Sequence, residues 1–178
     1  MNMETLKAIA MRKSTRAFNA EQITDQELNT IISAGCAAPV GMGAYETIHL
    51  TVLQNQDVMD EINNATAEAF GKPDLKPLYG APTVVIVSST KNTQFPKIEY
   101  ANAACIIENM LLAATDLGLG SVYLMGIIAA LNSSPDLLKK LDIPEGFTPV
   151  SAAALGYPVE PLTDVKELRQ TISTNIVK

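Results

Sequence analysis

The sequence is poor in the side chains that build metal sites and disulfide frameworks. It has two cysteines and one histidine among 178 residues. Cys36 and Cys105 fall within apolar helical patterns, which is not the arrangement of a disulfide-stapled fold. With His49 as the one histidine, we do not expect a zinc or iron site built from cysteine and histidine.

Short motifs of several large enzyme classes are also missing. The sequence has no GxSxG, HExxH, CxxC or Walker-type loop, and no nucleophile lies next to a histidine base. The glycine-rich pieces at 41–43 (GMG) and 118–120 (GLG) do not form the GxGxxG that opens a helix after a strand, which argues against a Rossmann fold. Glu99 and Glu108 are too far apart in helical phase to act as a carboxylate pair. An enzyme of this kind needs a cofactor that carries the reaction.

Charge and hydropathy narrow the class of protein further. The formal net charge is −6, which argues against general binding to nucleic acid or to anionic membranes. With 47% hydrophobic and 18% charged residues, the composition is globular, and we expect residues 1–178 to form a single domain. No apolar run reaches membrane-spanning length and no signal-like segment precedes the first charges, so we expect a soluble, cytoplasmic protein.

One basic segment stands out in this acidic chain. Residues 12–16 (RKSTR) hold three cations and two hydroxyls, directly after a predicted helix at 5–11. The arginines Arg12 and Arg16 offer planar, bidentate donors that suit phosphate, and Ser14 can add a hydroxyl donor. A solvated basic turn is the simplest explanation of such a segment. In a chain with net negative charge, a small phosphate-bearing anion is favoured instead.

Hydrophobic periodicity predicts helices and strands in α+β order. The segment at 98–117 is apolar on nearly all sides, more than a small domain can cover, so we expect a partner subunit against it. His49 should lie on the sheet face opposite Ile48 and Leu50, in a structural role. A marginal helix is predicted in the tail around Lys166 and Arg169. Helices are predicted at 5–11, 24–37, 57–70, 98–117 and 134–141, and strands at 47–52, 83–88, 121–125 and 150–155.

The basic segment belongs to an ordered set of blocks. RKSTRAF at 12–18 resembles the Arg-x-Ser-x-Arg-x-(Phe/Tyr) opening of the FMN-dependent nitroreductase family. Similar blocks follow in the family's order and spacing: AAPVG at 37–41, AATDLGLGS at 113–121, MG at 125–126 and ALGYP at 154–158. The resemblance implies an α+β sandwich with a central, mainly antiparallel sheet flanked by helices, and a homodimer with FMN between the subunits. It also implies ping-pong hydride transfer from NADH or NADPH to an organic acceptor such as a nitroaromatic or a quinone.

The resemblance also assigns residues on the phosphate side of the site. It places Arg12 and Ser14 on the phosphate and ribityl chain of FMN, and Arg16 near the pyrimidine edge of the ring. Lys13 would contact the cofactor through its backbone or side chain. A basic residue near the C-terminus often completes the phosphate site in this family. By position alone, Arg169 is the candidate, with Lys166 in reserve.

Around the ring, the implied contacts come from two loops. Met125 and Gly126 would lie beside the redox-active N5. Many members carry Asn, Gln and Pro where this chain has Gly43, Tyr45 and Glu46, so Gly41 and Gly43 either contact the flavin or only shape their loop. A second subunit would supply the remaining contacts through Pro39, Val40, Gly41 and Gly43.

Three other functions stay open at this point. One is a specialised member of the same fold, such as a reductive dehalogenase or a flavin-consuming enzyme, although the chain is short and has room only for a small lid near 68–78. Another is a flavin-binding or sensory protein without significant turnover. The last is a phosphate-binding interaction module that holds no flavin. No ribose-phosphate reader is recognisable, so the choice between NADH and NADPH is open as well.

Overall fold

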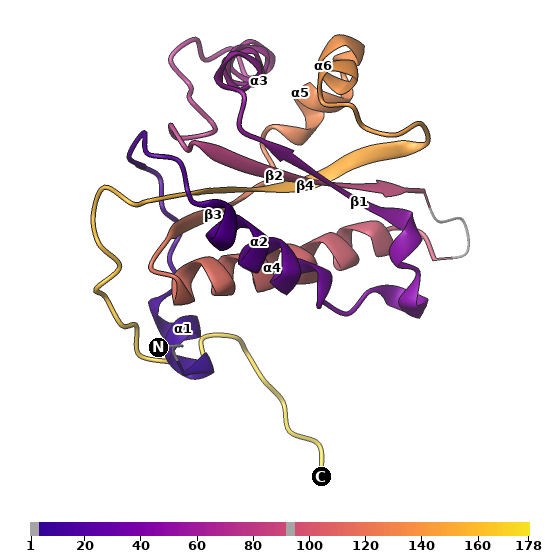
Figure 1. Ribbon diagram of the computed structural model, residues 1–178. Coiled ribbons are helices and arrows are strands. Elements are labelled where there is room, and N and C mark those ends of the chain that lie inside the picture. Colours follow the sequence, from indigo (N-terminus) through magenta and orange to yellow (C-terminus); the bar gives the residue numbers. More distant parts are fainter. Residues whose placement is uncertain (1–3, 92–94) are drawn as a thin grey trace.

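A computed structural model describes residues 4–91 and 95–178 (Figure 1). A four-stranded sheet in the order β1-β2-β4-β3 forms its middle layer, and every strand pair is antiparallel. The strands are β1 (Ile48–Leu53), β2 (Thr83–Thr90), β3 (Gly120–Leu124) and β4 (Phe147–Gly156). The predicted α+β sandwich around an antiparallel sheet is therefore confirmed.

Helices cover both faces of the sheet. On one face lie α1 (Thr5–Met11), α2 (Asp25–Cys36) and α4 (Ile98–Asp116), and on the other α3 (Gln56–Ala69), α5 (Ile128–Asn132) and α6 (Pro135–Lys140) (Figure 1). Two short 3-10 turns, Gly41–Gly43 and Tyr45–Thr47, lead from α2 into β1.

Local sequence explains where these helices begin. Thr24 and Glu27 form a capping box at the start of α2, in which each side chain bonds the backbone N–H of the other residue. Asn55 caps α3 through Val58 N–H, and Ser134 precedes α6, whose first residue is Pro135. These stop and start signals place the helix ends within a few residues of the sequence prediction.

The sheet separates two apolar cores. β2 is buried over residues 83–89, as expected of a β-branched central strand covered on both sides. Val85, Val87 and Leu155 pack toward α2 and α4, while Val84 and Ile86 pack toward α3, α5 and α6. His49 makes an edge contact with the Phe147 ring, with centroids 5.8 Å apart, which suits the structural role expected for it.

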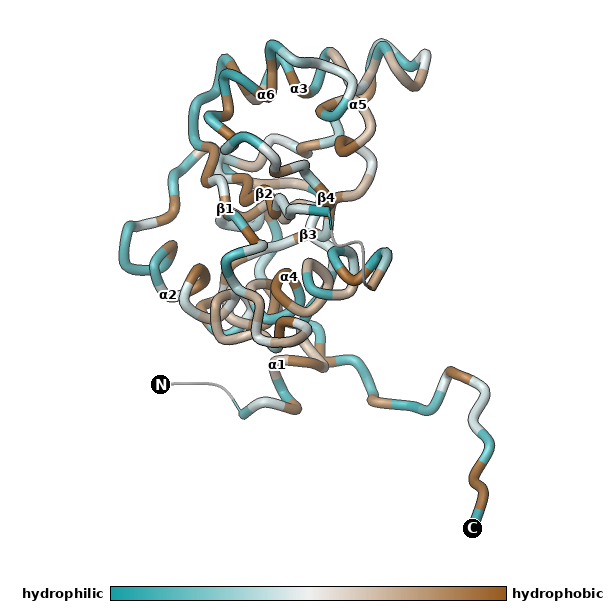
Figure 2. Tube along the Cα trace, turned by 90° about the vertical axis from the view of Figure 1, so that its right-hand side faces the viewer, coloured by the Kyte–Doolittle hydropathy of each residue, from teal (hydrophilic) through white to brown (hydrophobic). Residues whose placement is uncertain are grey.

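The sequence prediction misses one helix, and one of its expectations is wrong. α5 was not expected, because its five residues are too few to show a helical period. The marginal helix around Lys166 and Arg169 is absent, and residues 159–178 form no helix or strand. The tail leaves the body with apolar and polar residues alternating in exposed positions, so its side chains gain little packing that could stabilise a helix (Figure 2). Its exposed aliphatic residues are Val165, Leu168, Ile172, Ile176 and Val177.

Candidate functional site

The basic segment 12–16 is held to the edge of the sheet by its backbone. Ser14 pairs with Ser121 of β3 in a parallel bridge, and Thr15 N–H donates to the Ser121 carbonyl at 2.9 Å. Thr15 is buried against Gly120, where a Cβ would lie 2.7 Å from Thr15 Cγ2. Because the chain is extended here, neighbouring side chains alternate, and Ser14 and Arg16 face solvent on either side of Thr15.

Each cation of this segment has a different neighbour. Arg12 Nε lies 3.9 Å from Glu108 Oε1 on α4, and Lys13 Nζ lies 3.7 Å from Asp164 Oδ2 in the tail. Both carboxylates are more than half exposed, so each pair contributes little and a more highly charged phosphate can displace it. The Arg16 guanidinium lies over the ring of Tyr79, 5.9 Å from its centroid.

A cavity of about 270 Å³ opens beside the segment. It is bounded by the extended segment on one side and by the chain that follows β4 on the other. The combination of cations, an exposed serine hydroxyl and an open cavity suits a phosphate group. The residues that line it are Lys13, Ser14, Thr15, Arg16, Ala17, Val159 and Glu160.

Met125 and Gly126 follow the far end of β3, the strand to which the segment 12–16 is bridged. β3 runs from Gly120 to Leu124, so Met125 is separated by roughly 13 Å of extended chain from Ser121, the partner of Ser14. Met125 is half exposed, and a Cβ on Gly126 would meet no atom within 4 Å. β3 thus connects the cationic cluster at 12–16 to a stretch of backbone, Met125–Gly126, that has open space beside it.

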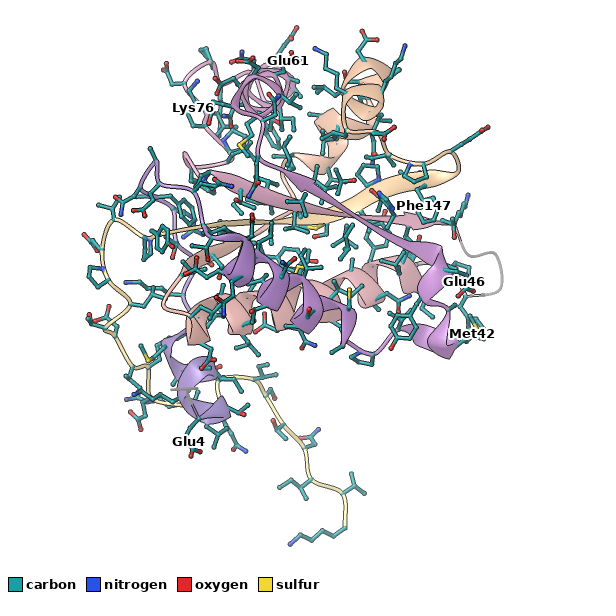
Figure 3. The ribbon with its side chains drawn as sticks, viewed as in Figure 1. Glu4, Met42, Glu46, Glu61, Lys76 and Phe147 are labelled. Carbon is teal, nitrogen blue, oxygen red and sulfur yellow. The ribbon has the colours of Figure 1, made fainter. Side chains whose placement is uncertain are left out.

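The loop 39–44 is not brought to this cluster within one chain. It packs against the beginning of α4, where Gly41 N–H donates to Asn102 Oδ1 at 2.9 Å. Met42 lies at one end of the α2–α4 layer and Glu4 of α1 at the other (Figure 3). Any contact of Pro39, Val40, Gly41 and Gly43 with a ligand at Arg12 therefore needs a second copy of the chain.

Both glycines of this loop have a shaping role. A Cβ at Gly41 would lie 2.3 Å from Ile98 Cδ1, and Gly43 has a φ of +66°. The N–H groups of Gly41 and Gly43 already donate to Asn102 Oδ1 and to the Val40 carbonyl. Met42, with a φ of 60°, stands exposed at the tip. Val40 is buried and Pro39 is exposed.

In the tail, the two basic candidates differ. Lys166 N–H donates to the carbonyl of Ala10 at 3.0 Å, which fixes the backbone of Lys166 close to the end of α1. The Arg169 guanidinium instead donates from Nε to Glu167 Oε2 at 2.8 Å. The backbone of Lys166 is thus tied to the body of the molecule, whereas the bond of Arg169 is to its own neighbour in the tail.

A second polar network holds the chain just beyond the segment. Asn19 N–H donates to the Tyr157 carbonyl at 2.9 Å, and Tyr157 OH donates to Glu27 Oε2 at 2.9 Å. Partial burial opposes ionisation of Glu27, but hydrogen bonds from Thr24 and Tyr157 outweigh it and lower the Glu27 pKa. The bond to Glu27, together with burial and the negative charge of that carboxylate, raises the pKa of Tyr157.

Sequence reasoning missed two residues that shape the site, Tyr79 beneath Arg16 and Asn102 behind Gly41. No motif marks either position. Among the described residues, histidine, cysteine, aspartate and glutamate side chains do not gather into a group able to hold a metal ion. No helix within 4–91 and 95–178 has the length and apolar character needed to cross a membrane.

Comparison with known proteins identifies the family. The model of the nitroreductase family matches residues 9–157. A putative NADH dehydrogenase/NAD(P)H nitroreductase of Archaeoglobus fulgidus is 31% identical over 156 residues, which are 87% of this chain and 86% of that protein.

Solved structures agree with the sequence relatives. A nitroreductase with bound FMN from Bacteroides fragilis is 33% identical, with a TM-score of 0.83 over 99% of this chain and 100% of that one. An FMN-bound nitroreductase from Desulfitobacterium hafniense is 25% identical, with a TM-score of 0.85 over the whole of both chains. In this chain the segment 12–16 and the Met125–Gly126 pair both adjoin β3. The chain belongs to the nitroreductase family.

Proposed function

We propose that this protein is an FMN-dependent oxidoreductase that takes hydride from NADH or NADPH and reduces an organic acceptor in alternating steps. The observation that carries the proposal is the cation-rich segment 12–16, which is bridged at Ser14 to Ser121 of β3, the strand that leads to the open Met125–Gly126 step. Relatives named NADPH-flavin oxidoreductase in Vibrio harveyi and FMN reductase (NADPH) in Bacillus subtilis support the same activity. Nitroaromatics and quinones are the acceptor classes that we expect.

The residues present fit FMN. Bound FMN supplies the redox chemistry, since it accepts and donates hydride. Arg12 and Lys13 hold the phosphate by exchanging their long, exposed ion pairs for charge-assisted contacts, and the exposed Ser14 hydroxyl adds a donor. Arg16 is the cation that balances negative charge at the pyrimidine edge of the ring. Gly126 leaves open space where a side chain would otherwise stand.

The functional unit that we propose is a homodimer. In a single chain, Ala101, Ala104 and Cys105 of α4 are exposed, as are Leu6 and Ile9 of α1. An exposed apolar surface of this kind on the core helix of a small protein favours a self-complementary contact. A two-fold axis across α4 brings the loop 39–44 of one copy to the segment 12–16 of the other, which completes two equivalent sites.

Flavin content is the first test of the proposal. We expect about one FMN per chain on acid release and chromatography, and bleaching of the visible bands by NADH or NADPH under anaerobic conditions. Addition of a nitroaromatic or quinone should restore the bands. A colourless protein that takes up no added FMN contradicts the proposal. A yellow protein that does not turn over with any acceptor is instead a flavin-binding or sensory protein.

Substitution of Arg12 tests the phosphate assignment. Arg12→Ala should weaken FMN binding by roughly 1.5–3 kcal/mol, the cost of losing a charge-assisted hydrogen bond. Lys140→Ala is the matched control, because it removes one positive charge on α6, where Lys140 Nζ lies 2.6 Å from Glu61 Oε2 on the other side of the sheet. Equal flavin content in the two variants would refute the role of Arg12.

Sedimentation equilibrium tests the dimer. Ala104→Glu places a charge on an exposed position of α4, so it should separate the subunits and release FMN without disturbing the core of one chain. Ala69→Glu, on the exposed end of α3, is the control and should leave the dimer intact. A yellow, active monomer at micromolar concentration contradicts the shared site.

A further inference from the structure

Tyr79 has an unusual backbone conformation for an aromatic residue. Its φ is 56°, in the left-handed region, and Gly80 follows with a φ of 73°. A bulky side chain in this region is uncommon and persists where its surroundings hold it there. Tyr79 N–H donates to the Lys76 carbonyl at 2.9 Å, which closes a turn immediately before β2. The turn therefore sets the direction in which the Tyr79 side chain leaves the backbone.

Buried neighbours on both sides fix this turn. Leu78 is 1% exposed, and its N–H donates to Oδ1 of the buried Asn63 at 3.2 Å. Ala81 is also buried, and its N–H donates to the Leu78 carbonyl at 3.0 Å. Both belong to the core between the sheet and α3. Tyr79 and Gly80, which lie between them, are thus anchored on both sides to this core.

The Tyr79 ring meets the one cation of the segment that is not paired with a carboxylate. Within residues 4–91 and 95–178, Arg12 and Lys13 each have an acidic partner, whereas Arg16 has none and lies 5.9 Å from the Tyr79 centroid. A ring attracts a guanidinium through its π-face and leaves the N–H donors at the guanidinium edge free. A carboxylate would occupy those donors and offset the charge.

We propose that Tyr79 is a positioning residue for Arg16, which it orients toward the bound cofactor without neutralising its charge. The inference rests on the proposed function, because it takes Arg16 to face FMN. The strained backbone of Tyr79 is the structural feature that places the ring beneath the guanidinium. Tyr79 contributes to cofactor affinity and to the reduction potential through Arg16, and it has no separate contact with FMN in this role.

Variants at this position separate the ring from the backbone. Tyr79→Leu removes the π-face, and Tyr79→Phe keeps it. Tyr79→Asn also removes the ring, but asparagine accepts a left-handed backbone, so this variant preserves the turn if leucine does not fold. We expect Tyr79→Leu and Tyr79→Asn to weaken FMN binding about two- to five-fold and to lower the flavin potential, while Tyr79→Phe stays close to wild type.

A double-mutant cycle with Arg16→Ala decides the mechanism. In the Arg16→Ala background, Tyr79→Asn should change neither the FMN dissociation constant, measured by quenching of flavin fluorescence, nor the potential. A purely structural Tyr79 would produce the same shifts in both backgrounds, which overturns the inference. It is also overturned if Arg16→Ala alters both quantities and Tyr79→Asn alters neither. Wild-type protein that binds no FMN refutes the proposed function itself, an outcome that is visible before any variant is made.

Discussion

The segment 12–16 and the loop 39–44 are both predicted to contact FMN, yet the fold holds them by different means. The segment is fixed through its backbone, by the bridge from Ser14 to Ser121, and its charged side chains remain available. The loop is fixed through a side chain, by the hydrogen bond from Gly41 N–H to Asn102 Oδ1. The segment thus uses its backbone to bond the sheet, whereas in the loop Gly41 N–H bonds α4 and Gly43 N–H bonds the Val40 carbonyl.

This difference suggests that the segment and the loop contact different parts of FMN. A segment with free cations is suited to a phosphate, whose charge needs several donors. A loop whose glycine N–H groups are already occupied, with Met42 exposed at its tip, offers shape and apolar contact instead. The loop is thus better suited to the face or edge of an aromatic ring than to an anion. Substitutions in the two regions should accordingly affect stability and FMN binding in different ways.

The largest effect should come from the close contact beneath the segment. Gly120→Val places a branched side chain where a single Cβ already lies 2.7 Å from Thr15 Cγ2, so it should force the segment off β3. We expect a loss of roughly 1–3 kcal/mol or more in the free energy of unfolding, together with loss of bound FMN. Urea titration and flavin content measure the two effects.

Gly126→Ala is the control for stability, since its Cβ would meet no atom within 4 Å. It should change the urea midpoint little. If Gly120→Val unfolds at the same urea concentration as wild type and retains its flavin, the segment is not held by this contact.

A smaller effect is expected from a substitution that loosens the loop 39–44. Asn102→Ala leaves the part-buried Gly41 N–H without its acceptor, which should cost roughly 1–3 kcal/mol of stability. Asn109→Ala on the same helix is the control, because Asn109 Nδ2 donates to the Ala34 carbonyl of α2 at 3.0 Å and not to the loop.

Both asparagine variants should lose stability, but only Asn102→Ala should speed hydrogen exchange at Gly41 and weaken FMN binding in the dimer. Equal exchange at Gly41 in the two variants would show that Asn102 does not hold the loop.

Much of the fold could be predicted because its signals are local. The capping box at Thr24, the β-branched run from Thr83 and the glycines after α4 each identify an element from neighbouring residues. The tail shows the limit of this reasoning. Its aliphatic spacing suits a helix, but a short helix needs packing to stabilise it, and the aliphatic residues of the tail are exposed.

The charged part of the site was predictable for the same reason, since Arg12 to Arg16 are consecutive. The residues that orient the site were not. Gly41 and Asn102 are 61 residues apart, and Tyr79 reaches Arg16 from the turn before β2. Such pairs arise only when the sheet and helices have assembled, so no spacing within the sequence reveals them. Family resemblance did not indicate Tyr79 either, because its blocks do not include the turn at 76–81.

The smallest effect concerns the anchor just beyond the segment, where Tyr157 OH donates to Glu27 Oε2 at 2.9 Å. The folded pKa of Glu27 is lowered, so its contribution to stability is present above pH 4.5 and is lost as pH falls through the folded pKa. The folded pKa of Tyr157 is raised above 10.0, so its contribution is present below pH 10.0 and is lost as pH rises through that higher pKa.

Urea midpoints measured across pH test both signs. Tyr157→Phe should remove the alkaline loss that belongs to this pair and reduce the acid loss, because Thr24 still donates to Glu27. Glu27→Gln should remove the acid loss and leave Tyr157 to titrate closer to its usual pKa. Since both groups remain partly exposed to solvent, the shifts should be small compared with those of Gly120→Val and Asn102→Ala. Identical pH profiles for wild type and Tyr157→Phe would show that this network does not contribute to anchoring the segment.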